Sequence, residues 1–158
     1  MEFRFADESD SKDLLNLIND AFAVEVFFHI GTRLDPGRIQ SHFQKGRFLV
    51  AESDGSLVGC VYVELHGDEG YLGLLSVDPQ LQKSGLGRRL VAAAEEFARE
   101  MGARRMDLTV VNLRTELPPY YAKLGYVVVG EEPIPEQMQA RVNQPCHFVR
   151  MSKPLGDG

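Results

Sequence analysis

Leu81-Gln82-Lys83-Ser84-Gly85-Leu86-Gly87-Arg88-Arg89 is the segment that decides how this chain is interpreted, because it stands between an expected strand and an expected helix. The glycines at positions 85 and 87 leave backbone N–H groups uncovered by a Cβ atom. Such groups at the N-terminus of a helix form a pocket for an anionic phosphate. Lysine and arginine flank the glycines in a chain whose formal net charge is -6. The segment therefore predicts a site for a phosphate-bearing ligand.

Two common phosphate loops do not fit this segment. A Walker A loop needs Gly-x-x-x-x-Gly-Lys-Ser/Thr, and the chain has no such order. A dinucleotide-binding fingerprint needs a third glycine or alanine where Leu90 stands, and an acidic residue after the next strand, where Asn112 and Arg114 stand instead. The glycines alone therefore leave the ligand open.

The residues around the loop predict alternating strands and helices. Strand-like runs at 47–53 and 57–65 are joined at Asp54-Gly55, a strong hairpin signal. A further strand at 71–77 ends at Asp78-Pro79, and apolar residues at helical spacing predict a helix over 86–101. The remaining expected elements are strands at 3–6, 105–111, 126–130 and 147–151, helices from Asp10 or Ser11, from Asp35-Pro36 to about Lys45 and at 119–124, and a proline-bearing loop at 131–145.

Two motifs in this order resemble those of a known family. A strand ending in Val77-Asp78-Pro79, the pattern Gln82-x-x-Gly85-x-Gly87 and a long amphipathic helix resemble the central motif of the GNAT acetyltransferase family. Asn112 followed by Tyr120-Tyr121-Ala122-Lys123-Leu124-Gly125-Tyr126 is similar to its Asn…Tyr-x-x-x-Gly-Phe/Tyr element. The resemblance runs from about residue 47 to 130. It implies a single α/β (α+β) domain over residues 1–153, in which helices cover both faces of a mixed, mostly antiparallel sheet. Residues 154–158 are expected to be a disordered tail.

The resemblance implies that the bound phosphate belongs to acetyl-coenzyme A. The amides of 83–87 would bind its pyrophosphate, and Arg88 and Arg89 would add charge. The strand at 75–77 would pair through its main chain with the pantetheine amides, and a backbone N–H near Leu75 would stabilise the oxyanion. The expected cofactor-binding residues are Leu75, Ser76, Val77, Gln82, Lys83, Ser84, Gly85, Leu86, Gly87, Arg88, Asn112 and Tyr121.

Tyr121 lies four residues before Gly125, where the family places its tyrosine general acid. A phenol with an unperturbed pKa of about 10 can donate a proton to a departing thiolate with a pKa of about 8.5. The alternative is that Tyr121 only packs on the cofactor groove, which is the role expected of Tyr120. Asn112 and Tyr121 lie further apart than in the commoner family pattern, so the cofactor role of Asn112 stays open.

The general base has several candidates. Glu64, His66 and Glu69 lie near the end of one expected strand and the start of the next, where the family often keeps a base or a water relay. Glu25 and His29 could instead line the acceptor pocket. Neither the four histidines nor the two cysteines have the spacing of a metal site, and no motif supports a thiol nucleophile.

We therefore predict an acyltransferase that moves the acetyl group of acetyl-coenzyme A to a primary amine by direct attack. The acceptor could be a small-molecule amine or an amine of a peptide or protein; the acidic balance favours a cationic one, although net charge is not pocket charge. The alternatives are a coenzyme-A-binding sensor or regulatory module, and transfer of a larger acyl group.

Composition bears on partners and location. A net charge of -6 argues against a nucleic-acid partner, and no apolar run approaches the roughly 20 residues of a membrane span. The first residues lack the apolar stretch of a signal peptide, so a cytoplasmic location is expected. The 131–145 segment and the last strand are candidates for a homodimer contact.

Overall fold

A single seven-stranded sheet forms the centre of the computed structural model, which describes residues 1–29 and 33–156. Its strand order is β1-β2-β3-β4-β5-β7-β6, and neighbouring strands run antiparallel except β4 and β5, which are parallel. The strands are β1 (Glu2–Phe5), β2 (Arg47–Ser53), β3 (Ser56–His66), β4 (Glu69–Val77), β5 (Arg105–Val111), β6 (Val127–Pro133) and β7 (His147–Pro154).

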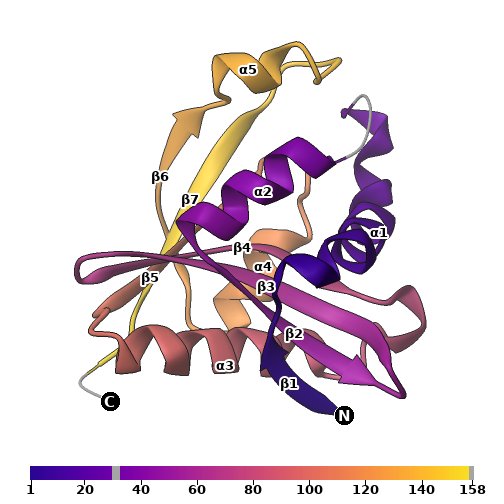
Figure 1. Cartoon of the computed structure of the whole chain (residues 1–158). Helices are drawn as coiled ribbons and strands as arrows, with labels where there is room; N and C mark the ends of the chain where they lie inside the picture. The colour runs from indigo at the N-terminus through magenta and orange to yellow at the C-terminus, as the bar shows by residue number, and fades with distance from the viewer. Residues whose placement is uncertain (30–32, 157–158) are drawn as a thin grey trace.

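Helices lie on both faces of this sheet, as the sequence predicted, with α1 and α2 on one side and α3 on the other (Figure 1). Asp35 caps α2 by accepting a hydrogen bond from the N–H of Arg38 at 2.8 Å, and Pro36 occupies its first turn. None of the described helices is both long and apolar enough to cross a membrane. The helices are α1 (Ser11–Ala21), α2 (Pro36–Lys45), α3 (Leu86–Glu100), α4 (Leu117–Lys123) and α5 (Glu136–Gln139), with short 3-10 helices at Glu8–Asp10, Phe22–Phe27 and Pro79–Leu81.

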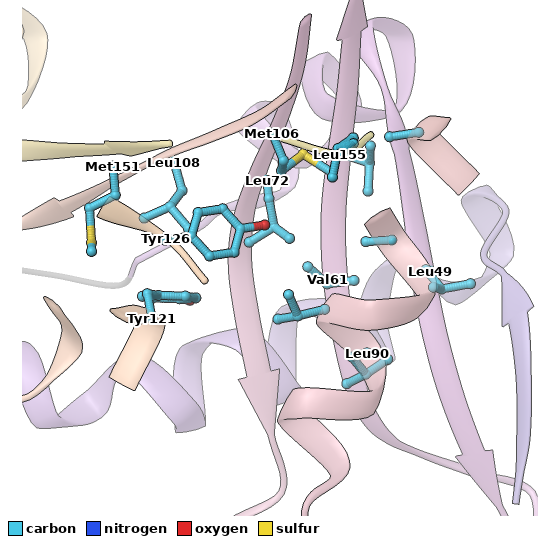
Figure 2. Close-up of a cluster of buried hydrophobic side chains, with 14 of the residues drawn as sticks. Leu49, Val61, Leu72, Leu90, Met106, Leu108, Tyr121, Tyr126, Met151 and Leu155 are labelled. Atoms are coloured by element: carbon cyan, nitrogen blue, oxygen red, sulfur yellow. The ribbon is translucent and has the colours of Figure 1, made fainter. Parts of the chain in front are cut away.

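The two faces of the sheet belong to two separate hydrophobic clusters. Alternate residues of β2 show the division, because Leu49 and Ala51 point toward α3 whereas Phe48 and Val50 point toward α1 and α2. We call these the α3 cluster and the α1–α2 cluster. Figure 2 shows members of the α3 cluster, among them Leu49, Val61, Leu72, Leu90, Met106, Leu108, Tyr121, Tyr126, Met151 and Leu155.

A bulge in β4 interrupts its pairing with β3. Cys60 and Tyr62 are two residues apart on β3, but their partners Ser76 and Gly73 are three residues apart on β4. The extra length lies at Leu74, whose φ angle of 53° is in the left-handed region that branched residues rarely adopt. The chain therefore keeps a strained conformation in the middle of a central strand.

The bulge turns side chains to the opposite face of the sheet. Leu72 packs in the α3 cluster, and Leu74 would follow it there in a regular strand. Leu74 packs instead in the α1–α2 cluster, and Leu75 returns to the α3 side. Two consecutive residues of β4 are thus left without a partner on β3.

β4 and β5 separate just before this bulge. Their parallel pairing begins at Glu69 and Arg105 and ends at Tyr71 and Asp107. Beyond that point β5 continues to pair with β7, while β4 continues beside β3. The sheet is therefore split over the second half of β4.

Two expectations for the C-terminal part were wrong. β6 continues to Pro133 and is followed by α5, so the segment 131–145 is only partly a loop. Pro154 ends β7, and Leu155 is buried in the α3 cluster with its carbonyl accepting a hydrogen bond from Arg99 at 2.7 Å. Residues 154 and 155 are therefore not part of a disordered tail, and residues 157 and 158 lie outside the described residues.

Candidate active site

A cavity of about 1130 Å³ opens where β4 and β5 separate. Pockets for one small ligand usually span about 300–1,000 Å³, so this cavity lies just above the upper end of that range. Its lining includes two groups of residues with different chemistry. The loop group is Leu75, Val77, Leu81, Gln82, Lys83, Ser84, Gly85, Gly87, Arg88 and Tyr120, and the charged group is Glu25, His29, Arg33, His42, Tyr62, Tyr71, Arg114 and Glu116.

The loop group presents backbone N–H groups at the start of α3. Lys83 and Gly85 have φ angles of 68° and 88°, so the backbone winds in the left-handed sense on both sides of Ser84. The N–H of Leu86 donates to Ser84 Oγ at 3.3 Å. Those of the next two residues lie in the first helical turn, where N–H groups have no intrahelical acceptor. The loop thus has the geometry of the predicted phosphate site.

Gly87 allows a close contact between this loop and α4. A Cβ atom at Gly87 would lie 2.7 Å from the hydroxyl oxygen of Tyr120. Tyr120 is half-buried and borders the cavity, which fits the wall role that the sequence predicted for it. The second glycine of the motif is therefore required by packing as well as by access to the backbone.

Most, but not all, of the expected cofactor-binding residues line the cavity. Ser76 is buried and its hydroxyl donates to the carbonyl of Leu74 at 3.0 Å, and Leu86 is buried in the α3 cluster. The side chain of Asn112 bonds to the backbone of β7, since its oxygen accepts a hydrogen bond from the N–H of His147 at 2.8 Å. These three side chains are outside the cavity lining, and Asn112 joins β5 to the start of β7.

Of the basic residues near the loop, two line the cavity and one does not. Lys83 and Arg88 are exposed side chains at the cavity. The guanidinium of Arg89 lies 5.0 Å from the centroid of the Phe3 ring and outside the cavity lining. The first two can therefore meet a phosphate in the cavity, whereas Arg89 packs against β1.

Tyr121 joins the hydrophobic core to the cavity. Its side chain borders the cavity but is only 6% exposed, and its ring lies 5.9 Å from that of Tyr126 (Figure 2). Burial raises the pKa of Tyr121 above its ordinary value, and the positive charge of Arg114 opposes that rise. Tyr121 therefore carries its proton at neutral pH.

The carboxylates expected as the base lie outside the cavity lining. Glu69 pairs with Arg105 at 2.9 Å, at the end of β4 where the sheet is still closed. Glu64 accepts hydrogen bonds from the hydroxyl of Tyr62 at 2.7 Å and from His66 at 2.9 Å. Glu64 is thus one side chain away from the cavity, since Tyr62 lines it.

His42 was not singled out by the sequence, yet it lies at the cavity beside Tyr62. Their ring centroids are 4.6 Å apart, and Nδ1 of His42 lies 2.8 Å from the carbonyl oxygen of Arg38. A carbonyl can only accept, so Nδ1 carries the proton and Nε2 of the neutral ring keeps its lone pair. Burial lowers the pKa of His42, which favours this neutral form. His42 lies in α2, four residues after Arg38, and belongs to no motif that would have predicted it.

A buried ion pair joins the two sides of the split sheet at the cavity. Glu25, near the end of the 3-10 helix after α1, is 2.8 Å from Arg114, which follows β5. Their side chains are 7% and 13% exposed, and the two residues are 89 positions apart in the sequence. Glu25 and His29 do line the cavity, as expected for an acceptor pocket, and Arg114 lies in the long connection between Asn112 and Tyr121.

The segment before β7 covers this part of the cavity. The N–H of Asn143 donates to the carbonyl of Phe28 at 3.0 Å, and the side chain of Gln144 donates to the carbonyl of Phe27 at 3.0 Å. Two segments far apart in the sequence therefore form one wall. Among the described residues, no group of three or more His, Cys, Asp or Glu side chains could hold a metal ion.

Comparison with known proteins gives a consistent result. A family model described as the acetyltransferase (GNAT) family matches residues 12–126. The amino-acid acetyltransferase of Neisseria meningitidis is 31% identical over 100 residues, which are 62% of this chain and 22% of that protein. This chain thus spans about a fifth to a third of the length of such curated relatives.

Solved structures show the same fold. The ribosomal-protein-S18-alanine N-acetyltransferase of Escherichia coli superimposes with a TM-score of 0.76 at 16% identity, covering 98% of this chain and 93% of that one. N-acetylglutamate synthase from Neisseria gonorrhoeae, solved with coenzyme A and N-acetyl-glutamate, gives a TM-score of 0.73 at 23% identity, covering 98% and 35% of the two chains.

The left-handed conformation of Gly85 makes a testable prediction. Replacing Gly85 with alanine should cost about 1 kcal/mol of stability, because a Cβ atom disfavours its φ angle of 88°. It should also weaken coenzyme A binding roughly tenfold in isothermal titration calorimetry, because the loop amides lose their alignment. Gly55→Ala is the matched control, since Gly55 has a φ of 80° in an open hairpin turn. Equal coenzyme A affinity for the two variants would show that the loop does not bind the cofactor.

Proposed function

Because the chain belongs to the GNAT acetyltransferase family, we propose that it transfers the acetyl group of acetyl-coenzyme A to a primary amine. The observation that carries the proposal is the common cavity, into which the loop group and the split between β4 and β5 both open. The loop offers amides for a pyrophosphate, and the split offers an unpaired strand edge for an amide-containing arm. Coenzyme A contains both groups.

The bulge in β4 supports direct attack at this edge. Leu74 and Leu75 have no partner on β3, and β5 has already separated from β4 at Tyr71. A backbone N–H near Leu75 can therefore donate to the thioester oxygen as it becomes an oxyanion. The amine nitrogen attacks the thioester carbon, the C–N bond forms, and the C–S bond breaks to release the coenzyme A thiolate.

Tyr121 is the proposed proton donor to that thiolate. Tyr121 carries its proton at neutral pH, and its position at the cavity beside the split supports the role. A general acid typically contributes about 10²- to 10⁴-fold to a rate. Arg114 lies close enough to favour the tyrosinate that forms when Tyr121 gives up its proton.

We expect Tyr121→Phe to lower kcat by roughly 100-fold or more, because the leaving thiolate loses its proton donor. The KM for acetyl-coenzyme A should change little, since the ring that borders the cavity is retained. Tyr120→Phe is the matched control, one residue away on the same wall, and should keep kcat within about threefold. Full turnover and an unchanged pH profile in Tyr121→Phe would remove the acid assignment.

The attacking amine must lose a proton, and we propose that His42 is the general base that takes this proton. Its neutral form has a lone pair on Nε2, and the ring lies beside Tyr62, which pairs with Gly73 next to the bulge. The charge of Glu64 favours the imidazolium that results, so this carboxylate acts through His42. The positive charges of Arg33 and Lys45 lower the pKa of His42, which keeps the resting ring neutral.

The proposed role of His42 as a base sets the direction of the pH dependence, and its lowered pKa moves the transition toward acidic pH. The base form is present at pH 7 and is lost as the pH falls through the imidazole pKa, so kcat at saturating substrates should decline on the acidic side with a midpoint below the ordinary value of about 6.5. His42→Asn should remove this acidic limb and lower kcat at pH 8 by about 100-fold. His66→Asn, an exposed histidine on the other side of Glu64, should leave the profile unchanged. If His42→Asn matches the wild type at both pH 6 and pH 8, the base is another group.

Thiol release from acetyl-coenzyme A against a broad panel of amines tests the overall activity. We expect amine-dependent release of one thiol per acetylated product, identified by mass spectrometry. Coenzyme A binding without release on any amine would favour the sensor or regulatory role. Faster release from propionyl- than from acetyl-coenzyme A would indicate a larger acyl donor.

A further inference from the structure

We propose that the acceptor amine carries a carboxylate, as an amino acid does, and that Arg33 is the residue that binds it. The inference rests on the proposed acetyl transfer and specifies its acceptor. It also reverses the expectation, drawn from the acidic net charge, that a cationic amine would be preferred.

Arg33 is held at the cavity by an aromatic side chain. It precedes α2 and lines the cavity as a half-buried residue. The guanidinium carbon lies 5.2 Å from the centroid of the Phe22 ring, which is within the range of a cation–π contact. Such a contact fixes the plane of the guanidinium while leaving its N–H donors available to a planar carboxylate.

The carboxylates nearby are already used by the other arginine of the charged group. Glu25 lies 2.8 Å from Arg114, and Glu116 lies 3.1 Å from the same guanidinium. Within residues 1–29 and 33–156, no carboxylate comes within 4.0 Å of Arg33. Burial accordingly lowers the pKa of Arg33, and Glu25 compensates from a longer distance. A ligand carboxylate would supply the missing charge.

Arg33 also lies near the groups assigned to the chemistry. Its charge acts on His42, the proposed base, and on Tyr71. The ring of Tyr71 is 3.1 Å from the position of a Cβ atom at Gly73, beside the bulge. In the proposed pose, the substrate carboxylate meets Arg33 and the amine lies toward His42 and the thioester, within the one cavity that Arg33 and His42 both line. Amino acids have the two groups a few bonds apart, whereas polyamines offer only positive charge to this arginine.

The first test compares acceptors that keep, neutralise or lack the carboxylate. Each standard amino acid is assayed for thiol release beside its carboxamide and its decarboxylated amine, with acetyl-coenzyme A saturating. We expect the best amino acid to exceed both analogues in kcat/KM by at least roughly tenfold, because each analogue leaves the guanidinium of half-buried Arg33 without an anion. Equal or faster acetylation of the analogues would overturn the inference and leave acetyl transfer intact.

The second test assigns the effect to Arg33. Arg33→Gln should raise the KM for the best amino acid about 10- to 100-fold, keep the KM for acetyl-coenzyme A within about twofold, and bring amino acid and carboxamide close to equality. Arg33→Lys should restore part of the difference. Arg89→Gln is the matched control, because Arg89 lies 5.0 Å from the Phe3 ring, outside the cavity, and should behave as the wild type. An unchanged amino-acid KM in Arg33→Gln would overturn the assignment.

A binding measurement separates this inference from the activity itself. Protein loaded with coenzyme A is titrated calorimetrically with the N-acetyl derivative of each amino acid and with the corresponding N-acetyl carboxamide. We expect at least one acid to bind the wild type roughly tenfold more tightly than its carboxamide, with the preference lost in Arg33→Gln. No preference in the wild type would contradict carboxylate recognition whether or not any amine is acetylated. Absence of thiol release together with a clear preference would instead contradict the proposed transfer.

Discussion

The site depends on a single interruption of hydrogen bonding in the sheet. Parallel pairing between β4 and β5 stops at Tyr71 and Asp107, and the bulge at Leu74 follows almost at once. A closed sheet would fill this region with ladder hydrogen bonds and leave no edge for a ligand. Two hydrophobic clusters and α3, which packs beneath β3 and β4, keep the halves together without those bonds. The strain at Leu74 is thus supported by burial on both faces.

Charge is arranged differently in the two parts of the cavity. At the loop, exposed Lys83 and Arg88 surround backbone amides, so an anion there would meet helix dipoles and solvated charge. At the charged group, the basic side chains and Glu25 are buried or half-buried, Glu116 is exposed, and Glu25 balances Arg114. Fixed charges in such a setting discriminate strongly between ligands, because each unpaired charge is costly. The chain's acidic net charge therefore does not describe its cavity.

The part of the site that could be predicted from the sequence is the part made locally. The loop from Gln82 to Gly87 and the Tyr121 element are short motifs, and their strand and helix signals are equally local, which is why they were found. Glu25 and His29 were expected as lining of the acceptor pocket, but the rest of the charged group was missed because it arises from contacts between distant segments, such as the ion pair of Glu25 with Arg114. The bulge could not be predicted from the sequence, because a residue in the left-handed region is normally glycine and the residue here is Leu74. Asn112 matched a motif, but its side-chain oxygen accepts a hydrogen bond from the N–H of His147 and does not line the cavity.

The wall formed by 22–29 and 142–144 lies outside the regular ladders of the sheet and is joined by backbone and side-chain hydrogen bonds. Its residues share no position with the loop that precedes α3. Phe22 of this wall contacts Arg33, so the proposed acceptor side of the cavity and the proposed donor loop use separate stretches of sequence, and mutations in one can accumulate while the other stays constant. For protein engineering, the wall together with residues 33–42, which include Arg33 and His42, is the natural unit to exchange or randomise when a new acceptor is sought.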